Sequence, residues 1–283
     1  MNICYIASES SVTELQDMLR EFGCSVSSVC SYETDFIIGM SVTQMPRIEQ
    51  AHRVFPHIPM INYNWDIYEW VWKSPRQGEY DYKRYGELLK ESAEVWVPSE
   101  CTGKRTEQWF GLSNWKVIKT SVPYYEAEVS DERFVLNPLR EIPDPHWGMF
   151  EKACKELGIP YKSTMHELSQ EEYRKIVASC SFIVSPLYEL STGGLTLIEG
   201  TYLGKPCLLS DSPWHGGRDY MGDRAWYFNH ESYDDLKIKL ADLWNSTPKL
   251  NREECKEWVE ENYSRKRMAK DIYERLCALK KKS

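Results

Sequence analysis

The sequence predicts an α/β protein made of two Rossmann-like, doubly wound domains. Short buried strands alternate with amphipathic helices along most of the chain, which is the pattern of a parallel sheet with helices on both faces. The alternation breaks near residue 123 and then restarts. The chain has 283 residues, enough for two domains. We therefore expect an N-terminal domain over 1–122, a C-terminal domain over 123–262, and a final helix with a tail over 263–283.

The first half of the chain gives the clearest alternation. An apolar run over 2–7 predicts a buried strand, and apolar residues then recur at helical spacing. Ser11 and Glu14 have the spacing of a capping box, which predicts a helix start there, and Gly23 suits the helix end. Further strands are expected at 25–30, 36–40, 58–62, 94–97 and 116–119, with helices ending near 93 and spanning 102–110.

An acidic, irregular stretch over 123–132 separates the two halves. Ser169 and Glu172 form a second capping-box pattern, which predicts a helix start at that point. The other elements expected after the break are strands at 134–136, 182–184 and 207–209, helices at 147–157 and 195–203, and an almost wholly helical stretch over the last fifty residues.

The composition indicates a protein of a reducing, cytoplasmic compartment. The chain carries 43 acidic and 35 basic side chains, a formal net charge of -8. That balance argues against a general nucleic-acid binder, because phosphate contacts need a basic surface. The nine cysteines form no CxxC pair, so neither a zinc site nor a disulfide framework is expected. We find neither an apolar run long enough to span a bilayer nor a signal-peptide pattern.

The segment Phe182–Ser210 carries the most chemical information. It is arranged as strand, polar loop, helix and strand, and its loop runs through Thr192-Gly193-Gly194-Leu195 into the helix. Backbone N–H groups at such a helix start can bind a phosphate or a sugar hydroxyl. Glu199 lies in the helix, where its carboxylate could accept two ribose hydroxyls, and Glu189 follows the strand. The alternative is a plain tight turn followed by a solvent-facing glutamate, and the residues alone leave both interpretations open.

This segment resembles the donor-site signature of the retaining glycosyltransferases of family 4, which have the two-domain GT-B fold. The matching residues are Ser185-Pro186-Leu187-Tyr188-Glu189, Gly193-Gly194, Glu199 and Gly204-Lys205-Pro206. The resemblance implies that Glu199 holds the donor ribose, and that Glu189 and the glycine loop face the sugar and its phosphates. It also implies that the last helix crosses back onto the N-terminal domain. Nine residues separate the two glutamates here, two more than the family usually has.

Two further donor residues are implied by the resemblance. Arg140 is the nearest basic residue to the place where the family carries a basic pair for the donor diphosphate, and Trp147-Gly148 stands where the family has Lys-Gly. His166 lies where relatives contact the nucleobase. The alternative for Arg140 is a solvated loop position beside Glu141. His215 lies in a loop that in relatives passes the donor sugar, and we expect it to be structural.

The acceptor is expected to meet the N-terminal domain. Trp65-Asp66 stands where relatives often show a pair of polar residues facing the acceptor, so Asp66 is a candidate for orienting a hydroxyl or acting as base. The segment 62–85 is rich in aromatic residues, and Trp65, Tyr68 and Trp70 are candidates for an acceptor-binding wall. The alternatives are that Asp66 caps the next segment and that the aromatic rings pack against their own loop.

The resemblance implies transfer of a sugar, with retention, from a UDP- or GDP-linked donor to an acceptor hydroxyl. No cofactor or metal is expected, and the chain contains no Asp-x-Asp. A nucleotide-sugar epimerase and a non-catalytic nucleotide-sugar-binding protein remain alternatives. An oxidoreductase is disfavoured because the first strand runs into Ser8-Glu9-Ser10-Ser11 rather than GxGxxG.

The sequence does not fix the acceptor. A saccharide or a glycolipid is favoured, and a hydroxymethylated base in DNA is a third possibility because compact viral members of the fold act on such bases. That third acceptor would need a basic surface on the N-terminal half. The candidate side chains are Lys73, Arg76, Lys83, Arg84, Lys104 and Arg105.

Overall fold

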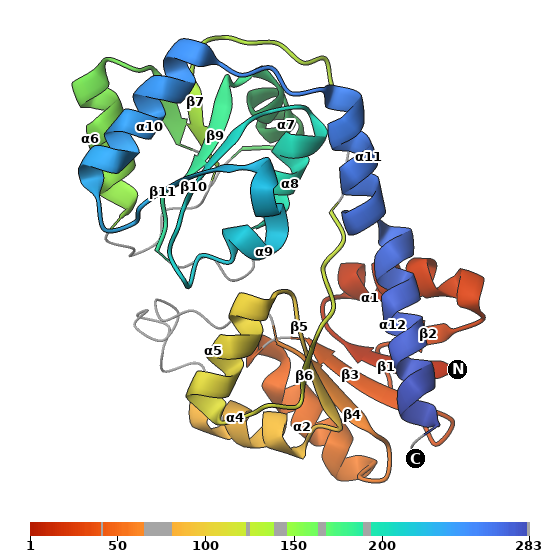
Figure 1. Cartoon of the computed structure of the whole chain (residues 1–283). Helices are drawn as coiled ribbons and strands as arrows, with labels where there is room; N and C mark the ends of the chain where they lie inside the picture. Colours follow the sequence, from red (N-terminus) through yellow and green to blue (C-terminus); the bar gives the residue numbers. More distant parts are fainter. Residues whose placement is uncertain are drawn as a thin grey trace. The chain divides into compact units, whose positions relative to one another are not determined.

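The computed structural model describes residues 1–40, 42–64, 81–122, 125–138, 146–163, 168–188 and 194–281. The chain divides into two compact units, one made of 1–121 with 263–283 and the other of 122–262 (Figure 1). Each unit is a sheet with helices on both faces, and every strand pairing among the described residues is parallel. The predicted α/β class with two Rossmann-like domains is therefore confirmed.

The first unit contains a six-stranded sheet of order β2-β1-β3-β4-β5-β6. Its strands are β1 (Asn2–Ile6), β2 (Ser25–Ser27), β3 (Phe36–Met40), β4 (Met60–Tyr63), β5 (Glu94–Val97) and β6 (Trp115–Val117). The central strands read as nearly continuous apolar runs because both of their faces are covered by helices.

Helices α1 (Glu9–Leu19) and α12 (Arg265–Lys280) cover one face of this sheet. The other face is covered by α2 (Met45–Val54), α4 (Tyr82–Glu91) and α5 (Glu100–Phe110). Short 3-10 turns over 20–22 and 42–44 follow α1 and precede α2.

Helix α12 belongs to the first unit although it is the last helix of the chain. It lies beside α1 (Figure 1) and packs a row of apolar side chains at helical spacing against the sheet. The row consists of Met268, Ala269, Ile272 and Leu276. The predicted return of the C-terminal helix to the N-terminal domain is confirmed.

The second unit contains a five-stranded sheet of order β11-β10-β9-β7-β8. Its strands are β7 (Val135–Asn137), β8 (Tyr161–Ser163), β9 (Phe182–Ser185), β10 (Cys207–Ser210) and β11 (Trp226–Phe228). Its helices are α6 (Trp147–Leu157), α7 (Gln170–Ser179), α8 (Gly194–Tyr202), α9 (Gly217–Met221), α10 (Tyr233–Ser246) and α11 (Arg252–Tyr263), with a 3-10 turn over 222–224. Helices α6 and α10 cover one face, and α8 packs on the other (Figure 1).

Several element boundaries differ from those that the sequence predicts. Helix α1 begins at Glu9, so Ser11 lies inside the helix and not at its N-cap. Helix α5 begins two residues earlier than expected, because Ser99 caps it by accepting a hydrogen bond from the Thr102 N–H. The strand expected over 25–30 stops at Ser27. All nine cysteines are free thiols. Within the described ranges, no helix combines the length and the apolar character that a membrane crossing requires.

Candidate functional site

The order of the second sheet locates a candidate ligand site. The chain passes from β7 outward to β8 and then returns to the other side of β7 to form β9. Ligands of open α/β sheets bind at such a reversal, outside the carboxyl ends of the strands. The segments that leave this edge are those after Asn137 and after Ser185, and they contain the predicted residues Arg140 and Glu189.

Helix α8 starts at Gly194, the second glycine of the predicted loop. It packs tightly on β9, because Leu197 and Ile198 are fully buried and a Cβ on Gly200 would lie 2.2 Å from Cδ1 of Ile183. A larger residue at position 200 would push the end of the Ile183 side chain out of its present place. This packing fixes the rotation of α8 and leaves Leu195 and Glu199 only partly buried.

Glu199 lies in a small polar cluster between α7 and α8. The hydroxyl oxygen of Tyr173 is 2.6 Å from the Thr196 Oγ1 and 3.3 Å from the Glu199 Oε2. Tyr173 is presented by α7, whose start is fixed by a complete capping box between Ser169 and Glu172, as the sequence predicts. The arrangement holds the carboxyl group of Glu199 in one orientation beside the start of α8.

Burial raises the pKa of Glu199 from 4.5 to about 7, and the Tyr173 hydrogen bond and the Arg174 charge oppose this shift. The Glu199 charge in turn adds to the effect of burial in raising the pKa of Tyr173. A carboxyl group with a pKa near 7 is poised to gain charge when a ligand donates hydrogen bonds to it. A vicinal diol, such as that of a ribose, offers two such donors.

A pocket of about 690 Å³ lies in the second unit, between the 125–132 segment and α7. Its lining includes Tyr125 and Arg174, and the Arg174 guanidinium lies 4.6 Å from the centre of the Tyr125 ring. The Glu199 charge contributes to the raised pKa of Tyr125, so the pocket and Glu199 are electrostatic neighbours.

The end of β9 is tied to the loop after β10. The Ser185 Oγ lies 2.7 Å from the Nε2 of His215, and the Gly217 N–H donates to the His215 Nδ1 at 3.1 Å. Since Nδ1 accepts, we assign the imidazole proton to Nε2, which donates to Ser185. His215 is 1% exposed, which is consistent with the structural role expected for it.

The lysine of the Gly204-Lys205-Pro206 step is an interior residue. Lys205 is buried, and its Nζ donates to the carbonyl oxygens of Ser130 and Cys180, each at 2.7 Å. These two hydrogen bonds connect the start of the second unit to the end of α7. The Lys205 ammonium group is therefore occupied inside the protein.

Most of the other predicted site residues lie outside the described residues. These are Trp65, Asp66, Tyr68, Trp70, Arg140, His166, Glu189, Thr192 and Gly193. Their assignments stay predictions. The structure places Leu195 and Glu199 together on α8, and it identifies one residue that sequence reasoning missed. This residue is Tyr173, which no local sequence pattern connects to a glutamate on another helix.

In the first unit, the chain is fixed just before the predicted acceptor residues. Asn64 follows β4 and is fully buried, and its backbone N–H donates to the Trp96 carbonyl at 2.8 Å. Its side-chain Nδ2 donates to the Thr106 Oγ1, and its Oδ1 accepts from the Tyr85 hydroxyl, both at 3.1 Å. Asn64 therefore anchors the backbone where it enters Trp65-Asp66.

Replacing Asn64 with leucine is expected to lower the free energy of unfolding by about 2–4 kcal/mol, because two buried side-chain hydrogen bonds are lost at once. The change is measurable by urea denaturation followed by circular dichroism. Thr106→Val and Tyr85→Phe serve as controls, since each removes one of the two bonds and is expected to cost less. A stability of Asn64→Leu within about 0.5 kcal/mol of the wild type would contradict the anchoring role.

The basic cluster proposed from the sequence is smaller in the structure. Arg105 is 2% exposed, so it is an interior residue of α5 and not part of a surface. Arg84 forms ion pairs with Glu49 and Glu87. Of the six candidates, Lys83 and Lys104 remain as exposed lysines within the described ranges, and 73 and 76 lie outside them.

No protein-family model and no curated protein matches this sequence. Solved structures, however, match nearly the whole chain. HepE from Anabaena, solved with UDP and glucose, has a TM-score of 0.71 at 11% identity, and the match covers 98% of this chain and 100% of HepE. A glycosyltransferase from Rickettsia africae has a TM-score of 0.70 at 11% identity, covering 100% of this chain and 98% of its own. Sucrose-phosphate synthase from Thermosynechococcus elongatus has a TM-score of 0.65 at 12% identity, and the match covers 98% of this chain and 81% of the synthase. The chain thus has the GT-B fold, and identities this low show the fold alone.

Proposed function

We propose that this protein is a glycosyltransferase that moves a sugar from a nucleotide diphosphate donor to an acceptor hydroxyl. The observation that carries the proposal is Glu199, a half-buried carboxyl with a pKa near 7 on the helix that follows the glycine loop. Its position in the motif is the one that holds the donor ribose in the resembling family. The HepE structure, solved with UDP and glucose, supports a nucleotide sugar as the donor.

The remaining donor contacts follow from the motif. Arg140 and the backbone N–H groups of 192–194 stabilise the departing diphosphate, which gains negative charge in the transition state. Glu189 holds hydroxyls of the transferred sugar, and His166 lies against the nucleobase. We propose transfer with retention of anomeric configuration, without a metal or another cofactor, in a cytoplasmic protein.

The acceptor side belongs to the first unit. Asp66 orients the acceptor hydroxyl, and Trp65, Tyr68 and Trp70 provide apolar surface for a sugar ring. Asn64 fixes the chain from which these residues follow. We favour a saccharide or a glycolipid acceptor over a hydroxymethylated DNA base, because two of the six basic residues that DNA would need are buried or already paired with carboxylates.

The proposal is tested by thermal unfolding with UDP, GDP and ADP, each at 1 mM. A nucleotide present at about 100 times its dissociation constant stabilises the folded state by about 2.7 kcal/mol, which raises the melting temperature by several degrees. We expect this shift with UDP or GDP, and a smaller one with ADP. The absence of a shift with all three would contradict a nucleotide-sugar enzyme.

The sugar donors are then tested directly by incubating the protein with UDP-glucose, UDP-galactose, UDP-N-acetylglucosamine and GDP-mannose. With acceptor pools of saccharides, glycolipids and hydroxymethylated duplex DNA, we expect transfer to one class of acceptor. Without acceptor, slow hydrolysis of the donor is expected. Recovery of an epimerised nucleotide sugar without hydrolysis would instead identify an epimerase, and binding without turnover under all conditions would identify a binding protein.

A further inference from the structure

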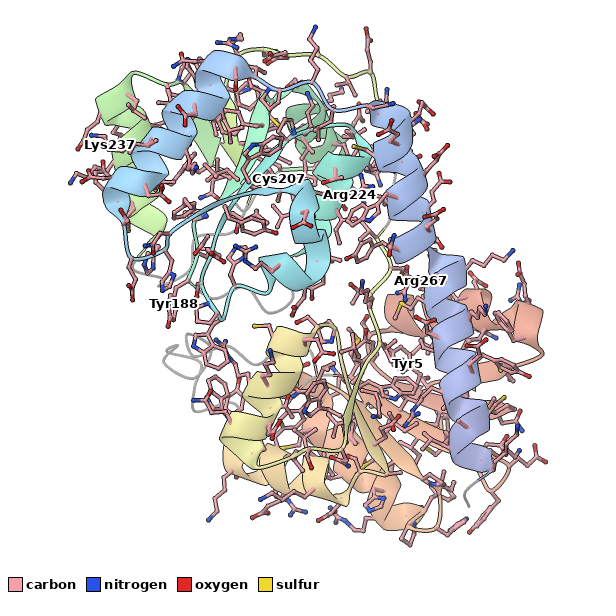
Figure 2. The ribbon with its side chains drawn as sticks, viewed as in Figure 1. Tyr5, Tyr188, Cys207, Arg224, Lys237 and Arg267 are labelled. Carbon is pink, nitrogen blue, oxygen red and sulfur yellow. The ribbon has the colours of Figure 1, made fainter. Side chains whose placement is uncertain are left out.

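Three histidines from three different loops surround the short segment that leads from β9 into Glu189. The segment is Ser185–Tyr188, and its partners are His146 before α6, His215 after β10 and His230 after β11. We call these histidines, together with Ser185 and Tyr188, the histidine clasp. Tyr188 lies where the chain leaves the carboxyl end of β9 (Figure 2).

The first part of the clasp is the hydrogen bond between His215 and Ser185. Ser185 is fully buried and His215 is 1% exposed, so the bond lies in the interior, where it is strong and costly to break. The Gly217 N–H fixes the imidazole from its other side. Position 217 must be glycine for this contact, because a Cβ there would lie 2.5 Å from the His215 Nδ1.

The second part is a pair of ring contacts made by Tyr188, one stacked and one tilted. The His146 ring lies 5.7 Å from the Tyr188 ring at an interplanar angle of 15°, and the His230 ring lies 5.5 Å from Tyr188 at 51°. Both separations fall within the range of favourable ring contacts. His146 makes no capping hydrogen bond with its side chain at the start of α6. Tyr188 is therefore held by rings from the loops that follow β7 and β11.

The clasp connects the loops after all four of the strands β7, β9, β10 and β11. One of them is the segment after β7 that contains Arg140, and another is the segment after β9 that contains Glu189. Glu189 directly follows Tyr188 in the chain, so a shift of the tyrosine backbone is passed to the glutamate. Groups that act on a reacting sugar have to be held to within about 0.5 Å, and loops achieve this only when neighbouring side chains support them.

We propose that the histidine clasp fixes the segment Ser185–Tyr188, from which the chain continues to Glu189, and that this fixing is required for the sugar-transfer step. The inference rests on the proposed function, because it assigns positioning residues to that same donor site. The clasp residues are positioning residues, and Glu199 on α8 holds the nucleotide independently of them. The clasp is therefore expected to govern the rate of sugar transfer far more than the affinity for the nucleotide.

The experiment compares variants that keep the rings with variants that remove them. Tyr188→Phe and the double variant His146→Phe/His230→Phe keep the ring contacts, whereas Tyr188→Ala and His146→Ala/His230→Ala remove them. Tyr161→Ala is the matched control, because it removes a ring contact of 5.7 Å with Phe150 in the same unit. Tyr161 is the first residue of β8, at the amino end of the strand, whereas the clasp lies at the carboxyl ends. For each protein we measure the melting temperature, the dissociation constant for UDP or GDP, and the rate of hydrolysis of the donor that the wild type uses.

The alanine variants are expected to hydrolyse the donor about 10- to 100-fold more slowly than the wild type, since a displacement of about 1 Å can cost that much. Nucleotide affinity should stay within about 3-fold, because Glu199 on α8 holds the nucleotide independently of the clasp. A tenfold change would correspond to about 1.4 kcal/mol of binding free energy. The phenylalanine variants should recover most of the rate, and Tyr161→Ala should keep it despite a similar loss of melting temperature.

Three results would overturn the inference. The alanine variants could keep the wild-type rate, the phenylalanine variants could fall as low as the alanine variants, or rate and nucleotide affinity could fall in parallel as they would in a partly unfolded protein. A wild-type protein that neither binds a nucleotide nor hydrolyses any donor would contradict the proposed function and the inference with it. An active wild type with unaffected alanine variants would contradict the clasp alone.

Discussion

Replacing Arg275 with methionine is expected to lower the free energy of unfolding by about 3–5 kcal/mol, because Glu94 would remain as an unpaired charge in the interior. Arg275 on α12 binds both carboxylate oxygens of Glu94 on β5, and the Glu94 side chain is only 6% exposed. The Trp96 indole N–H donates to the same carboxylate at 3.0 Å. Within the part of the chain that the structure describes, loss of the guanidinium leaves only the Trp96 hydrogen bond to compensate a buried negative charge.

The measurement is urea denaturation at pH 7, with circular dichroism to follow the transition. Lys270→Met on the same helix is the matched control, because the ion pair of Lys270 with Glu274 is 63% exposed on both sides and should contribute less than about 1 kcal/mol. Glu94→Gln/Arg275→Met should recover part of the loss, since the double variant removes the unpaired charge. A single variant as stable as Lys270→Met would contradict this account of how α12 is held.

Replacing Glu199 with glutamine is expected to have opposite effects on stability and on nucleotide binding. A carboxyl group whose pKa is about 7 when folded and 4.5 otherwise binds its proton more readily in the folded state. It therefore stabilises the fold at low pH, and this contribution is lost as the pH rises from about 4.5 through 7. Glu199→Gln stays neutral, so without ligand it should match the wild type near pH 4 and exceed it by about 1–3 kcal/mol at pH 8.

Binding of a nucleotide should show the reverse preference, because ribose hydroxyls donate to the ionised carboxylate. The wild type is expected to bind UDP or GDP about 10-fold more tightly at pH 8 than at pH 6, since only about a tenth of Glu199 is ionised one unit below its pKa. At pH 8, Glu199→Gln should bind about 10- to 100-fold more weakly than the wild type, the usual effect of losing hydrogen bonds to a charged group.

Isothermal titration calorimetry from pH 5.5 to 8.5 checks the binding arm. The pH dependence of affinity that remains in Glu199→Gln reports the titration of the nucleotide's own phosphate, and it is subtracted from the pH dependence of the wild type. Tyr173→Phe is a second control, because the Tyr173 hydrogen bond lowers the pKa of Glu199 and its removal should move the midpoint to higher pH. Equal affinities for wild type and Glu199→Gln at pH 8 would remove Glu199 from the nucleotide site.

Sequence reasoning predicted well several features that neighbouring residues set, although Ser11 lies inside α1 and not at its N-cap. The capping box of Ser169 and Glu172 joins residues three apart, and it starts α7 as expected. The central strands β3 and β5 have the predicted bounds, because burial on both faces gives them uninterrupted apolar runs. Strands β8 and β11 were not predicted, since each has three residues at a sheet edge and is only partly buried.

The candidate site was predicted only as far as its motif extends. Glu199 was placed on the correct helix because the glycine loop and the helix are contiguous in the sequence. Its pKa depends on Tyr173 and Arg174, which lie on a different helix, and no spacing rule connects them. Arg105 shows the converse error, because its charge suggested a surface position and the fold buries it. The histidine clasp was also out of reach, because its members come together only when the sheet is assembled.

The discontinuity of the first unit has a consequence for synthesis on the ribosome. The second unit is continuous in the chain, whereas the first unit needs residues from 263 onward to cover one face of its sheet. During translation, the packing partners Ile272 and Leu276 become available to Ile3, Tyr5 and Leu15 only after the second unit has been synthesised. The half that emerges first is therefore completed last, and its apolar face is the one that a chaperone would have to shield in the meantime.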